Sequence, residues 1–238
     1  MADNRLIFGG EDSSTFGIYI SGEGVFDAPE RTVEMVEIPG RNGALTIDKG
    51  KYENIEVTYP AFNYEPAMND FVDNLSDFRN ALCSKKGYQR LEDTFHPDEF
   101  RMAVYRSGLE VKPIKYNTAS EFDIKFDCKP QRFLKSGETV VTLTGTDTIT
   151  NPTLFDSKPL LVVTGTGNLT VNGVQIAISE TPTTIDCEAM EAYNGTTSRN
   201  SDIVLTPNEF PTLAPGENTI TLGSGITKLE ITPRWWRI

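Results

Sequence analysis

Residues that commonly build catalytic and metal sites are scarce in this chain. Its 238 residues include one histidine, His96, and three cysteines, Cys83, Cys128 and Cys187, none in a Cys-x-x-Cys pair. A zinc site needs three or four such ligands, and a cysteine nucleophile needs a histidine beside it. Neither is therefore predicted, and the odd, scattered cysteines indicate reduced, buried thiols. We expect His96, which lies in a turn beside Pro97, to be exposed to solvent.

Long apolar runs and phosphate-binding motifs are also missing. No stretch approaches the roughly 20 apolar residues of a membrane span, and no basic region followed by an apolar segment opens the sequence. The GxxxxGK[ST] phosphate loop does not occur. Acidic pairs such as Asp98-Glu99 leave a cell-wall hydrolase open, although nothing in their spacing favours one. We therefore predict no enzyme activity, no cofactor, no metal and no membrane contact.

Basic residues are outnumbered. The chain carries 22 Lys and Arg against 34 Asp and Glu, a net charge of −12. A protein that grips nucleic acid by its phosphates needs a basic surface, so specific nucleic-acid binding is not predicted. Solubility is the simplest reason for the charge. The hydrophobic content of 38% is sufficient for folded cores.

The clearest local pattern lies near the middle of the sequence. Between Glu121 and Lys129, Phe122, Ile124, Phe126 and Cys128 alternate with charged residues, as in a strand with one buried face. We expect Lys129-Pro130 to end this strand, because proline cannot donate to a ladder. The composition changes after it, which predicts two domains, residues 1–135 and 136–238.

The first domain is predicted to be α+β and similar to a split barrel, with one helix. Apolar residues from Met68 to Leu82 recur at helical spacing, with acidic residues on the other face. Residues 40–53 are polar and rich in turn signals, with a reversal expected at Lys49-Gly50-Lys51, and we expect a projecting loop or hairpin arm there. The arginines at 90, 101 and 106 should form a basic, polar side of a hairpin. Strands are expected at 6–8, 16–20, 31–38, 44–48, 54–59, 88–93, 100–106, 111–116 and 121–129.

The second domain is predicted to be a β-sandwich or jelly roll. It is rich in Thr, Gly, Asn, Ile and Val, and turn signals such as Asn172-Gly173 separate short apolar runs. Strands are expected at 139–143, 160–164, 168–171, 174–178, 183–187, 202–205, 218–222 and 228–233. The chain as a whole is therefore mainly β.

The C-terminal segment contains the only two tryptophans, Trp235 and Trp236. Adjacent residues on a strand point to opposite faces, so one ring is expected in the core and the other at a surface. The pair is either an aromatic platform for a sugar or a partner protein, or a last strand that seals the sandwich and rests on a neighbour. We favour the second reading and treat both residues as a candidate partner surface.

Several motifs, each weak alone, together resemble the distal tail (Dit) proteins of long, non-contractile-tailed phages, the siphovirus tail component family. The resemblance covers nearly the whole chain through the order and spacing of these motifs. They are residues 16–20 (FGIYI), 39–43 (PGRNG) with Asp48, Gly50, Tyr52 and Asn54 after it, 90–93 (RLED), 126–133 (FDCKPQRF) and 233–236 (PRWW).

This resemblance implies a structural hub at the tip of a virion tail, assembled in the bacterial host cytoplasm. The first domain would form a hexameric ring that joins the major tail tube protein to the tail-associated tip protein and lets DNA pass. The second would be a galectin-like β-sandwich outside the ring, an attachment point for receptor-binding or other baseplate proteins. The alternative is a carbohydrate-binding module that recognises host cell-wall polysaccharide.

A ring of identical subunits needs a heterologous contact, and a projecting hairpin supplies one. The candidate subunit-interface arm is therefore represented by Arg41, Asn42, Lys49, Lys51 and Tyr52. An acidic channel would also repel DNA phosphates, which gives the net charge a second purpose.

Overall fold

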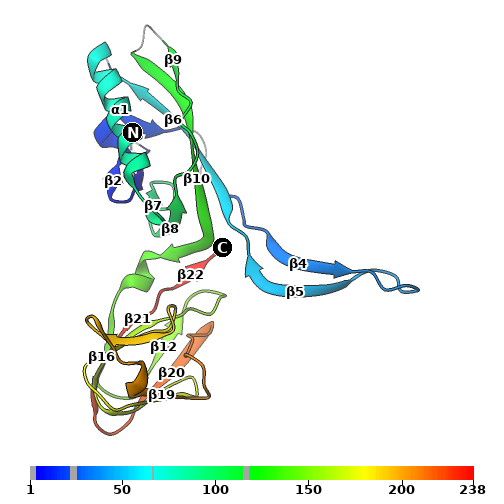
Figure 1. The fold of residues 1–238 in the computed structure, drawn as a ribbon, viewed down its shortest axis with the longest axis vertical. Coiled ribbons are helices and arrows are strands. Elements are labelled where there is room, and N and C mark those ends of the chain that lie inside the picture. The colour runs from blue at the N-terminus through cyan, green and yellow to red at the C-terminus, as the bar shows by residue number, and fades with distance from the viewer. Residues whose placement is uncertain (1–3, 22–25, 66, 115–117) are drawn as a thin grey trace. The chain divides into compact units, whose positions relative to one another are not determined.

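The computed structural model describes residues 4–21, 26–65, 67–114 and 118–238, and Figure 1 shows its fold. The chain is mainly β, as predicted. It divides into two compact units: unit 1 comprises Met1–Arg132 together with Ile238, and unit 2 comprises Phe133–Arg237. No helix among the described residues is long and apolar enough to cross a membrane.

Unit 1 is built on an antiparallel sheet with strand order β2-β1-β7-β8-β10-β6-β3, to which β9 adds beside β10. The helix α1 (Met68–Ser84) covers one face of this sheet with Phe71, Leu75, Phe78 and Leu82. Its four buried positions are spaced by four, three and four residues, so they form one stripe along the helix. The strands are β1 (Leu6–Phe8), β2 (Glu11–Asp12), β3 (Ile18–Ile20), β4 (Arg31–Val36), β5 (Leu45–Tyr52), β6 (Ile55–Tyr64), β7 (Gln89–Asp93), β8 (Glu99–Val104), β9 (Lys112–Ile114) and β10 (Ala119–Leu134). A short 3-10 turn, η1 (Ser13–Phe16), precedes β3.

The central strand β10 is longer than predicted. It continues through Pro130 to Leu134, so the expectation that Lys129-Pro130 ends it was wrong. Its ladder with β6 runs from Ala119 to Cys128 and stops there. At Pro130 no β6 partner needs an N–H, and a proline is therefore tolerated.

The reversal predicted at Lys49-Gly50-Lys51 was also wrong, because β5 runs straight through it. The pairing with β4 shifts register between Arg31 and Val33, as at a bulge. Two residues of β4 here face four of β5, and within this stretch Gly50 has φ +70° and donates its N–H to Asp48 Oδ1 at 2.9 Å. Turn-type residues here serve a bulge inside a hairpin.

The third correction concerns β8, where the burial pattern is the reverse of the expected one. Glu99 and Arg101 face the interior together with Ala103, whereas Phe100 and Met102 are only partly buried. Arg101 therefore does not contribute to a polar outer side. Arg90 does lie on that side, with its guanidinium carbon 3.8 Å from the centre of the Phe100 ring.

Unit 2 consists of two antiparallel sheets with strand orders β11-β21-β13-β16-β17-β18 and β12-β20-β14-β15-β19. Alternate residues of both sheets form one apolar core that includes Leu161, Ile176, Ile220 and Leu229. This is the layered arrangement of a β-sandwich. The strands are β11 (Val141–Leu143), β12 (Asp147–Asn151), β13 (Leu160–Gly165), β14 (Gly167–Val171), β15 (Val174–Ile178), β16 (Thr183–Asp186), β17 (Glu191–Asn194), β18 (Thr197–Ser198), β19 (Ile203–Thr206), β20 (Gly216–Leu222), β21 (Ile226–Thr232) and β22 (Trp236–Arg237), with 3-10 turns η2 (Lys135–Glu138) and η3 (Asn200–Asp202).

Candidate assembly surfaces and a buried polar cluster

The first candidate surface is the hairpin formed by β4 and β5, hereafter the arm (residues 31–52). The two strands make a sheet of their own, separate from the main sheet of unit 1 (Figure 1). Val36 pairs with Leu45 and Glu34 with Ile47 across the hairpin. No arm residue belongs to either hydrophobic core. The arm therefore lies outside the hydrophobic core of unit 1.

Two ion pairs join the two strands of the arm, and a third lies at the end of β5. Arg31 pairs with Asp48, Lys49 pairs with Glu34, and Lys51 Nζ lies 3.1 Å from Glu53 Oε1. The hydrogen bond from Arg31 lowers the pKa of the Asp48 carboxyl group. All these groups are exposed, so the pairs orient the strands more than they stabilise them.

Apolar side chains occupy both faces of the arm. Paired residues of an antiparallel ladder share a face, so Val33 and Met35 lie on one face and Leu45 and Ile47 on the other. All four are exposed, Met35 to 59%. An isolated two-stranded hairpin is marginally stable in water. A two-stranded sheet with exposed apolar residues on both faces is therefore suited to being covered by another surface.

The structure places the predicted arm residues at opposite ends of this hairpin. Arg41 and Asn42 lie exposed in the turn 37–44, whereas Lys49, Lys51 and Tyr52 lie in the last part of β5. A strand of eight residues spans roughly 26 Å, so the five residues do not form one cluster. Tyr52 is tied to the arm's own base, where its hydroxyl accepts from Arg31 Nη1 at 3.3 Å.

Sequence reasoning missed the apolar members of the arm. The arm residues predicted from the sequence were mainly turn and charged residues, and Val33, Met35, Leu45 and Ile47 were not among them. The signal that could have found them is the alternation of apolar and polar residues in 31–36 and 45–48 without a third strand to cover either face.

The two tryptophans have different environments. Trp235 is 5% exposed and belongs to the core of unit 2. Trp236 is partly exposed and stacks on Phe155 with ring centres 4.4 Å apart, and its Nε1 donates to the Asp156 carbonyl at 2.9 Å. Only Trp236 therefore retains a surface that a partner could contact.

Arg234 fixes the segment that carries these rings. Its Nη1 and Nη2 donate to the two carboxylate oxygens of Asp186 at 2.7 and 2.9 Å. This fork lowers the pKa of Asp186, chiefly through the hydrogen bonds from Arg234. The Asp186 carboxylate also accepts from the backbone N–H groups of Glu188 and Ala189. One carboxylate thus anchors both a turn and the C-terminal segment.

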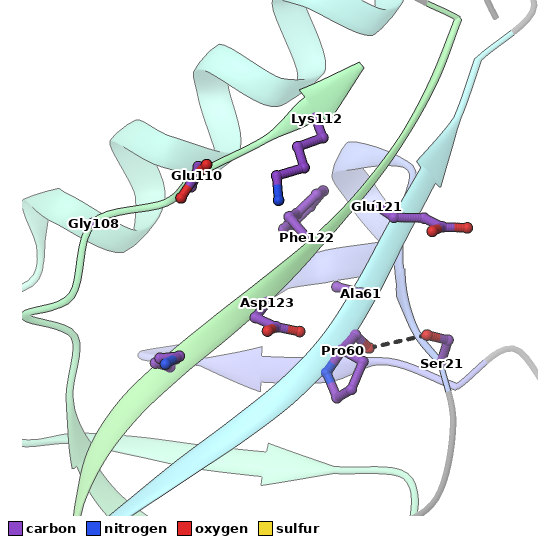
Figure 2. Close-up of a pocket in the computed structure, with 10 residues that line it drawn as sticks. Ser21, Pro60, Ala61, Gly108, Glu110, Lys112, Glu121, Phe122 and Asp123 are labelled. Atoms are coloured by element: carbon purple, nitrogen blue, oxygen red, sulfur yellow. Dashed lines mark hydrogen bonds between the residues drawn. The ribbon is translucent and has the colours of Figure 1, made fainter. Parts of the chain in front are cut away.

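A groove of about 560 Å³ lies beside β10, shown in Figure 2. Glu110, Glu121 and Asp123 line it together with Lys112 and Lys125. These mixed charges provide no nucleophile and no metal-ligand set. Among the described residues, no group of three or more His, Cys, Asp and Glu side chains is arranged to hold a metal ion.

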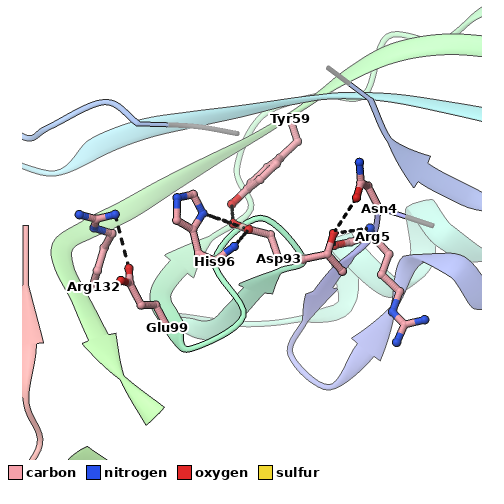
Figure 3. A network of polar contacts seen from close by, with 8 residues as sticks. Asn4, Arg5, Tyr59, Asp93, His96, Glu99 and Arg132 are labelled. Atoms are coloured by element: carbon pink, nitrogen blue, oxygen red, sulfur yellow. Dashed lines mark hydrogen bonds and ion pairs between the residues drawn. The ribbon is translucent and has the colours of Figure 1, made fainter. Parts of the chain in front are cut away.

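A buried polar cluster lies where the turn between β7 and β8 meets β6 (Figure 3). Asp93 accepts hydrogen bonds from the Tyr59 hydroxyl at 2.8 Å and from the His96 backbone N–H at 2.8 Å, and its Oδ1 lies 3.0 Å from His96 Nδ1. Burial, and then Asp93, raise the pKa of Tyr59 well above its ordinary value. The His96 side chain is only 16% exposed, so the expectation of a solvent-exposed histidine was wrong. Its partner Asp93, three residues earlier, holds the ring against the core.

Comparison with known proteins gives a likeness in structure alone. No family model and no curated protein matches the sequence. The crystal structure of the Dit protein of phage SPP1, described as a paradigm of the hub adsorption apparatus in phages that infect Gram-positive bacteria, matches with a TM-score of 0.74. The match covers 99% of each chain at 11% sequence identity.

The chain has the Dit fold. The resemblance seen in the sequence is therefore confirmed at the level of fold. Two structures of the phage P2 baseplate in its activated conformation, with Ca and with Sr, match at a TM-score of 0.49 and 11% identity. They cover 96% and 99% of this chain, and 97% and 98% of those chains.

Proposed function

We propose that this chain is the structural hub of a siphophage tail tip and has no enzyme activity. The observation that carries the proposal is the full-length match to the SPP1 Dit hub protein, which includes both units. In this proposal residues 1–135 form a hexameric ring between the major tail tube protein and the tail-associated tip protein. Residues 136–238 form a galectin-like sandwich that offers attachment to receptor-binding or other baseplate proteins at the virion tail tip.

The arm is the proposed contact between neighbouring subunits. It has apolar side chains on both faces, and its own charges are largely paired within the hairpin. When a neighbouring subunit covers the arm, apolar surface is removed from water and the ion pairs within the hairpin stay intact. The turn cation Arg41 and the neighbouring Asn42 then lie at the far end, where they reach the next subunit.

The proposed ring would let DNA pass through its centre. The protein has a net charge of −12, and like charges repel DNA phosphates over about a Debye length. DNA should therefore not adhere to the channel wall. Exposed carboxylates such as Glu121 and Asp123 on β10 are candidates for the channel wall. Channel-facing acidic residues should keep the purified assembly from binding DNA at physiological salt.

Light scattering after size exclusion tests the ring. One chain has a mass of 26.4 kDa, so a hexamer has six times that mass, about 158 kDa. We expect the hexamer or a double ring, with a central channel in negative-stain images. A monomer at every concentration, in the presence and absence of the tube protein, would contradict the proposal.

The arm can be removed without breaking unit 1. The Glu53 N–H donates to the Glu30 carbonyl at 3.0 Å, so the two ends of the arm are adjacent and an Asn-Gly turn can replace residues 31–52. We expect this variant to remain folded and monomeric. The control is V204T, which removes an equally exposed apolar residue from unit 2 and should leave the ring intact. A ring formed by the armless variant would show that the subunits meet elsewhere.

A further inference from the structure

The strand β19 is the last strand of its sheet in unit 2, with β15 on one side and no strand on the other (Figure 1). The Ser179 N–H donates to the Asp202 carbonyl at 2.9 Å, and such bonds recur at every second residue of an antiparallel ladder. Val204 therefore bonds to β15, whereas Ile203 and Leu205 direct their N–H and C=O groups away from it. No other described group bonds to these main-chain atoms. The free edge of β19 thus presents two donors and two acceptors.

An apolar groove of about 350 Å³ lies at this free edge. It is lined by Met190, Ile203, Val204, Leu205 and Phe210, together with two asparagines. Successive side chains of a strand point to opposite faces, so three consecutive residues of β19 line one groove because it follows the edge of the strand. Met190 and Val204 are 64% and 63% exposed. Unpaired main-chain groups and apolar surface therefore occur together, which is the combination that an added strand uses.

The charges next to the groove are acidic. The described residues that line it include no lysine and no arginine. Glu191 and Glu209 each adjoin a lining residue in the chain, and both are exposed and form no ion pair with a described residue. The nearby cation Arg199 is already paired, since its Nη1 lies 3.1 Å from Asp202 Oδ2. An occupant with lysine or arginine between its apolar residues therefore matches both the lining and the charge.

We propose that β19 accepts an extended segment of another baseplate protein as an added strand, in which apolar residues alternate with lysine or arginine. The main chain of the segment bonds to Ile203 and Leu205, its apolar side chains enter the groove, and its cations lie near Glu191 and Glu209. Because β19 has 4 residues, the pairing spans about 13 Å. The inference rests on the proposed function, from which it takes the partner to be a baseplate protein.

Binding of two fluorescent peptides to the full-length protein tests the chemistry of the occupant. One peptide alternates valine with lysine, and its matched control alternates valine with glutamate. At low ionic strength the lysine peptide should bind about tenfold more tightly or better. E191K/E209K should weaken its binding about tenfold, whereas E217K, which changes an exposed glutamate on β20, should leave it unchanged. Failure of the lysine peptide to bind, equal binding of both peptides, or an equal loss in both variants would overturn the proposal.

Hydrogen exchange followed by mass spectrometry locates the contact in wild type, whether the protein is a monomer or a ring. Saturating lysine peptide should slow exchange in the segment that contains Ile203 and Leu205. Exchange in β12, the strand at the opposite edge of the same sheet, should not change. Binding without slower exchange at β19 would overturn strand addition. Protection that rises with protein concentration in the absence of peptide would also overturn it, and would assign the edge to a second copy of this chain.

The outcome can be separated from that of the proposed function. A ring that forms while the lysine peptide fails to bind would refute this inference and leave the hub in place. A chain that stays monomeric at every concentration, with and without the tube protein, but shows peptide-dependent protection at β19 would refute the ring and support the binding edge.

Discussion

Substituting Asp186 with asparagine should loosen the C-terminal segment of unit 2 by a predictable amount. In the wild type the carboxylate receives a two-pronged hydrogen bond from Arg234, and the two side chains are 15% and 30% exposed. Hydrogen bonds to charged groups contribute about 1.5 to 3 kcal/mol. Partial exposure screens the pair, so we expect D186N to cost about 1 to 2 kcal/mol at neutral pH. Asparagine keeps one side-chain oxygen that can accept the hydrogen bond from the turn at Glu188. The substitution therefore removes the charged pair with Arg234 and leaves the acceptor for the turn in place.

The loss should depend on pH with a definite sign. The folded state lowers the pKa of Asp186, so its stabilising contribution is complete above the unfolded value of about 3.9. As the pH falls through the still lower folded value, the carboxyl group is protonated and comes to resemble asparagine. The difference between wild type and D186N should therefore persist down to about pH 4 and shrink below it.

Tryptophan fluorescence during urea unfolding is the assay, because both tryptophans of the chain lie in unit 2. A loss of about 1 to 2 kcal/mol should move the midpoint by about 1 M urea for a unit of this size. E188Q is the matched control: Glu188 pairs with Lys158 across an exposed surface, and its loss should cost less than about 0.5 kcal/mol. An unchanged midpoint for D186N at neutral pH, or a difference that stays constant from about pH 5 to pH 2, would refute the reasoning.

Three further outcomes are expected. G137A should destabilise unit 2 by about 1 to 3 kcal/mol, because an added Cβ would overlap the backbone of the C-terminal segment; a wild-type fluorescence midpoint would contradict this. F78A should lower the free energy of unfolding of unit 1 by about 3 to 5 kcal/mol, measured by circular dichroism, and leave the tryptophan fluorescence transition of unit 2 unchanged. A shift of both transitions would show that the units unfold together. A thiol reagent at about pH 8 should modify the exposed Cys83 quickly. Burial raises the pKa values of Cys128 and Cys187 to about 12, so these two should react only on unfolding. Modification of all three cysteines in the native protein would contradict that burial.

Local patterns in the sequence were sufficient for the regular elements. The stripe from Phe71 to Leu82 is a helix, and the alternation from Phe122 to Cys128 is a strand with one buried face. Both follow from the direction of successive side chains, which a few neighbouring residues determine. Turn signals predicted a projecting loop or hairpin arm at 40–53, which overlaps the hairpin that the structure forms at 31–52, although Lys49-Gly50-Lys51 was taken for a reversal when Gly50 occupies a bulge.

Only the tertiary structure decided which face of β8 is buried. The apolar residues Phe100 and Met102 alternate with Glu99 and Arg101, so periodicity alone turns the charged pair outward. In the fold these charges point inward, together with Asp93 at the end of β7, His96 in the turn after it and Arg132 on β10. Those groups are far apart in sequence, and their meeting depends on strand order, which no local pattern contains.

The same reason limits what the sequence said about surfaces. That Trp235 and Trp236 face different ways follows from the alternation of a strand, but which ring is buried depends on the sandwich that closes around it. The arm's apolar faces likewise became visible once the structure showed that no strand of its own unit covers them. Sequence determined the elements because side-chain direction is local; burial, charge pairing and exposed faces came from packing between distant segments.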